Sequence, residues 1–146
     1  MLGTTSSLLG HYAKLCESLT GLYSRLAECE ASADLKSVLL GYAEGASRQR
    51  LSVERAYREA VTDAYSVGFL PEPLDETEYR IGHDISESPT RGDLIEAAMT
   101  LEETTSRFLV RGAGSVLSQL PEVAQAMTVA AGGCSRRIEA LRSMSK

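Results

Sequence analysis

The chain has 146 residues, of which 43% are hydrophobic and 24% are charged, and it carries a net charge of −5 at pH 7. These values are typical of a single folded domain with its own core, and the negative charge argues against nucleic acid as a general partner. The sequence has no basic region followed by a long apolar run, so it predicts neither a signal peptide nor a membrane partner. Cys16, Cys29 and Cys134 lack metal-type spacing and indicate reduced thiols of a cytoplasmic protein.

The first half of the chain predicts two helices. Leucine and tyrosine recur at steps of four and three residues from Leu8 to Leu26, which predicts a helix over about residues 4–31. After a break at residues 32–34, a second apolar seam runs from Leu35 to Ala60 and predicts a helix over about 34–66. Ser32 or the next acidic residue, Asp34, can cap its first turn.

Residues 67–90 show no sustained period and contain three of the four prolines, which indicates a long connection with room for a short helical turn. His83, Asp84 and Glu87 are close in sequence and could hold a surface metal. The alternative is a solvated connection that lies along the rest of the molecule.

Two further helices follow. Thr90 and Asp93 form a capping-box pattern that opens a helix over about 91–117, and Ser118 is expected to cap a fourth helix over about 120–144, with Pro121 in its first turn. Short links within each pair predict antiparallel hairpins. The fold class is therefore all-α: a single domain of four helices, made of two hairpins and one long crossover, which is the ferritin-like arrangement.

The two predicted hairpins resemble each other. Residues 17–27 align with 103–113 at an offset of 86, and residues 43–51 align with 130–138 at an offset of 87. A duplicated hairpin explains this pattern, although chance similarity stays open. The second alignment places the adjacent glycines of "AAGGCSRR" (130–137) inside a helix, where each costs roughly 1 kcal/mol relative to alanine.

On these segments the chain resembles the rubrerythrin branch of the ferritin-like family. The stretch "CESLTGLYSRLAECEASADLKSVLLGYAEGASRQRLSVERA" (16–56) is similar to that family's first hairpin, and "TLEETTSRFL" (100–109) with "AAGGCSRRIEALRSM" (130–144) is similar to the second. The resemblance implies a di-iron site built from one glutamate on each of two helices and a Glu-x-x-His pair on each of the others. Carried over residue by residue, the ligand positions are Cys16, Ala46, Gln49, Glu102, Gly133 and Arg136.

Only Glu102 keeps its carboxylate at these positions, so the resemblance implies a degenerate metal site, with no cofactor expected and iron as the alternative. Helical geometry turns Glu102 toward the core, where a lone charge is costly unless it is paired. Arg136 or Arg137 on the fourth helix can supply the partner. The alternatives are that Glu102 faces solvent, or that the small residues leave a cavity for an apolar ligand.

The function expected from this pattern is that of a non-catalytic structural or interaction module, with no catalytic residues. The resemblance implies a homodimer, and a different protein partner is compatible with it. The alternatives are a rubrerythrin-type di-iron oxidoreductase or iron-handling protein, and a small-molecule binding protein that uses the vacated core. Redox regulation through Cys16 and Cys134 is a further hypothesis.

Overall fold

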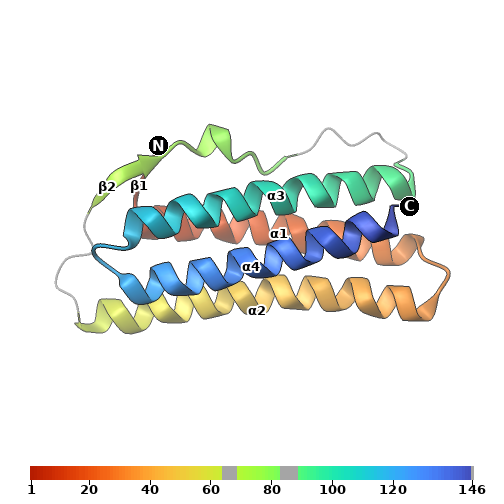
Figure 1. Cartoon of the computed structure of the whole chain (residues 1–146), viewed down its shortest axis with the longest axis horizontal. Helices are drawn as coiled ribbons and strands as arrows, with labels where there is room; N and C mark the ends of the chain where they lie inside the picture. Colours follow the sequence, from red (N-terminus) through yellow and green to blue (C-terminus); the bar gives the residue numbers. More distant parts are fainter. Residues whose placement is uncertain (64–68, 83–88, 146) are drawn as a thin grey trace.

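The computed structural model describes residues 1–63, 69–82 and 89–145 and is dominated by four long helices (Figure 1). The helices are α1 (Thr5–Cys29), α2 (Ala33–Asp63), α3 (Arg91–Val116) and α4 (Pro121–Met144). The prediction of four helices packed as an all-α bundle is confirmed.

Each helix packs on two others, and neighbouring helices run in opposite directions (Figure 1). α1 and α2 form one hairpin and α3 and α4 the other, while α1 also packs on α3 and α2 on α4. The predicted seams face the core: Leu8, Leu15 and Leu19 are fully buried on α1, and Leu101 and Phe108 are fully buried on α3. The bundle is therefore a consequence of helical periodicity, because each apolar stripe needs a neighbour that covers it.

The crossover contains a strand that the sequence did not predict. Strand β2 (Phe69–Leu74) pairs antiparallel with a short strand β1 (Leu2–Thr4), and a 3-10 turn, η1 (Glu76–Glu78), comes after it. Pro71 and Pro73 are tolerated because β2 has only one partner strand. The two strands lie at one end of the bundle, and the connection then runs along the helices toward the other end (Figure 1).

The helix ends confirm one predicted cap and correct another. Thr90 and Asp93 make the predicted reciprocal capping box, with the Thr90 amide donating to Asp93 Oδ2 at 2.9 Å. Ser118 does not cap α4: the N-cap is Leu120, which has no side-chain hydrogen bond, and Pro121 is the next residue. Leu120 is instead buried, so packing holds this end of the helix.

α4 continues without a break through Gly132 and Gly133. Neither glycine has a positive φ, so the pair is not there for backbone freedom. The reason must lie in what surrounds the helix at this point.

None of the helices in the described residues has the length and apolar character that a membrane span requires.

Candidate functional site

A cluster of polar side chains lies at the centre of the bundle, and every helix contributes to it. Tyr23 comes from α1, Gln49 from α2, Glu102 from α3, and Cys134 and Arg137 from α4. We call these five residues the buried polar cluster. Glu102 is completely shielded from solvent and Arg137 is 7% exposed, which is rare for charged side chains.

The Glu102 carboxylate accepts hydrogen bonds at both oxygens. Its Oε2 accepts from Arg137 Nε and from the Tyr23 hydroxyl, the latter at 2.5 Å, and its Oε1 accepts from Arg137 Nη2 at 3.2 Å. This two-point contact matches the planar fork of a guanidinium to a carboxylate. The buried negative charge is therefore compensated by a buried positive one.

Arg137 also reaches beyond Glu102. Its Nη1 donates to Gln49 Oε1 at 3.0 Å, and its Nη2 lies 3.6 Å from the Cys134 sulfur. Burial alone would lower the pKa of Arg137, but its hydrogen bonds to Glu102 and the Glu102 charge raise that pKa above its usual value. Arg137 thus stays charged and links α4 to both α2 and α3.

Gly133 provides the space that Gln49 occupies. A Cβ placed on Gly133 would lie 1.7 Å from Gln49 Nε2 and 2.7 Å from Gln49 Oε1, so an alanine there would displace the amide. A Cβ on Gly132 would meet only Arg136 Nη1, at an ordinary contact distance of 3.7 Å. Of the two adjacent glycines, only Gly133 is needed by the buried polar cluster.

The structure places most of the predicted site positions on the core side of the helices. Cys16 and Ala46 are buried at 2% and 1% exposure, Glu102 and Gly133 are buried, and Gln49 is half-buried. Arg136 is exposed, so the expectation that it faces the core is wrong. It lies two residues after the buried Cys134, which turns it about 200° away around the helix. Arg137, the other arginine considered for the pair with Glu102, makes the contact.

The sequence interpretation missed the role of Tyr23 and favoured Arg136 over Arg137. A signal for both was present in the spacing. Tyr23 lies four residues after the buried Leu19, and Arg137 lies three residues after Cys134 and four before Leu141. Helical periodicity alone therefore predicts that both side chains face the core. The alignment of the two hairpins at an offset of 87 instead pairs Gln49 with Arg136, which is the wrong arginine.

The residues present at the predicted ligand positions do not fit a di-iron centre. Ala46 and Gly133 carry no donor atom, Gln49 offers an amide, and both Glu102 oxygens are engaged by Arg137. A guanidinium at this point also repels an incoming cation. In the described ranges no three His, Cys, Asp or Glu side chains gather in a way that could hold a metal. The candidate surface metal residues His83, Asp84 and Glu87 lie outside the described residues.

Two buried thiols, Cys134 within the cluster and Cys16 on α1, are protonated. Burial raises the pKa of Cys16 to about 12, and burial together with the Glu102 charge raises the pKa of Cys134 even further. Burial likewise raises the pKa of the Tyr12 and Tyr23 hydroxyls. Since the thiolate is the reactive form, both buried thiols are expected to be inert in the folded protein.

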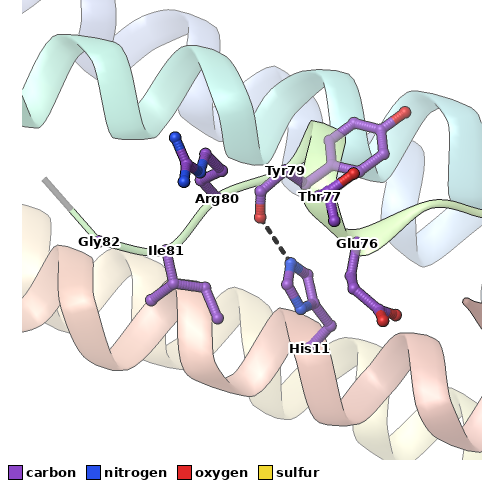
Figure 2. Close-up of a pocket in the computed structure, with 7 residues that line it drawn as sticks. All are labelled: His11, Glu76, Thr77, Tyr79, Arg80, Ile81 and Gly82. Carbon is purple, nitrogen blue, oxygen red and sulfur yellow. Dashed lines mark hydrogen bonds between the residues drawn. The ribbon is translucent and has the colours of Figure 1, made fainter.

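A separate hollow of about 490 Å³ lies where the crossover passes over α1 (Figure 2). His11 points from α1 toward the crossover, and its Nε2 donates to the Tyr79 carbonyl oxygen at 2.7 Å. Phe108 packs against the rings of both residues, with centroids 5.2 and 5.3 Å away. These contacts hold the crossover on the bundle and explain the position of His11 without a ligand.

Comparison with known proteins found no match for this chain among protein-family models, among curated proteins or among solved structures. The ferritin-like resemblance therefore stays a prediction from the sequence.

Proposed function

We propose that this chain is a non-catalytic, ferritin-like four-helix protein in which an ion pair replaces the metal centre, and that it serves as a structural or interaction module. The observation that carries the proposal is the pairing of Glu102 with Arg137. Glu102 keeps its carboxylate at a predicted ligand position, and both of its oxygens accept hydrogen bonds from the guanidinium of Arg137 on the facing helix. A metal would have to displace Arg137 and leave its charge buried and unpaired, which is strongly unfavourable.

Metal analysis tests this proposal directly. The purified protein is incubated anaerobically with Fe(II), and in parallel with Mn(II), then desalted and measured by plasma emission spectroscopy. We expect no stoichiometric metal and no rise in the melting temperature, because a bound metal would stabilise the folded state. A content near two iron atoms per chain, as a di-iron bundle requires, would contradict the proposal and favour the rubrerythrin-type alternative.

The interaction role is proposed for a face of α2. Leu40 and Leu51 are 46% and 55% exposed, and their spacing of eleven residues places them within about 20° of each other around the helix. Glu44 and Ser47 lie between the two leucines on the same side of α2, so the face is mixed apolar and polar. We propose that this face forms a homodimer in a cytoplasmic setting, with the two leucines as its apolar contacts.

Light scattering coupled to size-exclusion chromatography tests the dimer. We expect the mass of two chains for the unsubstituted protein and of one chain for the double variant Leu40→Lys/Leu51→Lys. Val129→Lys is the matched control, since Val129 is 62% exposed but lies on α4. A monomeric parent protein, or equal dissociation by the control, would overturn the dimer.

A further inference from the structure

A hollow of about 390 Å³ opens between α2 and α4, next to the buried polar cluster. Its walls include the backbones of Gly41, Gly45 and Gly133, and three of its side chains are arginines: Arg48, Arg136 and Arg137. Among the described residues, none that lines it is acidic. The hollow is therefore a basic pocket on a chain whose net charge is −5.

Two of these arginines differ from several others on the surface. Arg50, Arg91 and Arg142 each contact a glutamate. Arg48 and Arg136 are exposed, and in the part of the chain that the structure describes neither forms a salt bridge within 4 Å. Neither therefore forms a salt bridge within the described residues, although Glu44 lies four residues before Arg48 and Glu139 three residues after Arg136. The charge of Arg137 is paired with Glu102.

Gly45 brings the α2 backbone close to the guanidinium of Arg137, which is 7% exposed. A Cβ on Gly45 would meet Arg137 Nη1 at 3.6 Å and no other side-chain group within 4 Å. The same Nη1 is fixed by its hydrogen bond to Gln49. Arg137 thus lies at the floor of the hollow with its charge paired with Glu102, while Arg48 from α2 and Arg136 from α4 line the hollow as exposed side chains.

We propose that this pocket binds the dianionic oxyanion group of a small molecule, either a phosphate group or a pair of carboxylates. Guanidinium groups donate paired hydrogen bonds to such oxygens, and a low-dielectric floor strengthens the attraction. The walls of Gly41 and Gly45 allow the anion to approach the helix backbone closely. The site uses other side chains than the proposed interaction face, although Arg48 lies three residues before Leu51 on α2.

Isothermal titration calorimetry at constant ionic strength tests the proposal with two probes, inorganic phosphate and succinate, against a chloride background. We expect saturable binding of at least one probe at one site per chain. Phosphate alone would identify a phosphate-bearing ligand, and succinate alone a dicarboxylate. Saturable binding of neither probe would overturn the proposal.

Matched variants locate the binding. Arg48→Gln and Arg136→Gln are each expected to weaken the affinity about tenfold, because each removes a charge-assisted contact. Arg111→Gln, on the exposed surface of α3, is expected to leave the affinity unchanged. None of these substitutions touches the pair of Glu102 and Arg137, so folding is retained. Equal affinities for all three variants and the parent protein would overturn the assignment.

A second pair of variants tests the floor of the pocket without altering charge. Gly45→Ala places a methyl group beside Arg137 Nη1 and is expected to weaken binding severalfold. Gly21→Ala is the control, since a Cβ at Gly21 meets nothing within 4 Å and lies on α1. Unchanged binding in Gly45→Ala would contradict a contribution from Arg137.

Discussion

Arg137 joins three helices through one guanidinium, so its loss would affect several partners at once. The guanidinium bonds to Glu102 on α3, to Gln49 on α2 and to Cys134 on its own helix. Buried ion pairs of this kind often add little net stability, because removing two charges from water costs about as much as their attraction returns. Their stronger effect is on the penalty for removing one partner alone.

We therefore expect Arg137→Met to lower the free energy of unfolding by about 3–5 kcal/mol, since Glu102 would keep its charge in an apolar interior. Glu102→Gln is expected to cost a similar amount. The double variant Glu102→Gln/Arg137→Met should lose less than the sum of the two single losses. Urea unfolding followed by circular dichroism measures all three.

A surface pair on the same helix serves as the control for that cycle. Arg142 contacts Glu139 with both side chains at least half exposed, and such pairs contribute about 0–1 kcal/mol. Arg142→Met should therefore change stability by no more than that amount. If Arg137→Met were no more damaging than Arg142→Met, the central role of the buried pair would be wrong.

The adjacent glycines of α4 offer a direct comparison. Gly132→Ala is expected to stabilise the protein by about 0.5–1 kcal/mol, because alanine is the better helix former and the new methyl group makes an ordinary contact. Gly133→Ala gains the same propensity but displaces Gln49 from Arg137, and a net loss of roughly 1 kcal/mol is expected. Thermal unfolding monitored by circular dichroism separates the two.

The Gln49→Ala background tests the cause of that difference. With the amide removed, Gly133→Ala has nothing to displace and should become neutral or stabilising. A loss that persists in this background would show that Gly133 is needed for a reason other than the placement of Gln49.

Among the elements, the crossover is held to the bundle by a few specific bonds. The Ser115 hydroxyl of α3 donates to the Glu72 carbonyl of β2 at 2.7 Å, and Ser115 is only 3% exposed. The side-chain Nε2 of Gln119 donates to the Phe69 carbonyl oxygen at 3.1 Å. Together with the contact of His11 to Tyr79, these bonds position β2 and the segment after it.

We expect Ser115→Ala to lower stability by about 1 kcal/mol and to speed amide exchange in residues 69–74, because the Glu72 carbonyl loses its α3 partner. Hydrogen exchange followed by mass spectrometry gives both the location and the extent. Ser135→Ala is the matched control, since the Ser135 hydroxyl bonds within its own helix and its side chain is exposed. Faster exchange spread over all four helices would argue against a local role.

At the scale of the whole molecule, the buried phenols and thiols make stability depend on alkaline pH. Their folded-state pKa values lie above the unfolded values, so the stability they contribute is complete below about pH 8.5 and falls as the pH rises toward 12. In this pH range each thiol lowers the free energy of unfolding by about 1.4 kcal/mol per pH unit. Unfolding midpoints in urea measured from about pH 7 to about pH 11 should show a continuous decline above about pH 8.5.

The exposed Cys29 provides an internal control for the burial of the Cys16 and Cys134 thiols. A thiol reagent at mildly alkaline pH should label Cys29 alone in the folded protein and all three cysteines after unfolding. Rapid labelling of Cys16 or Cys134 in the folded state would contradict their burial.

Much of this fold could be predicted because the apolar seams are long and regular. The four helices, the Thr90 cap and the inward orientation of Glu102 all result from periodicity and capping chemistry. The strand at Phe69–Leu74 could not be predicted, since it has two prolines and depends on pairing with residues far away in sequence. Within the site, the choice between Arg136 and Arg137 required a register accurate to one residue, which an approximate repeat does not give.

The pairing of β1 with β2 has a consequence for the order in which the chain folds. Each helical hairpin closes through a turn of only a few residues, whereas pairing Leu2 with Leu74 closes a loop that contains the whole first hairpin. Loop-closure entropy rises with length, and long-range pairings form late when local contacts are available. We therefore expect the helices to pack first. The pairing of β1 with β2 then forms last and fixes the crossover on the assembled bundle.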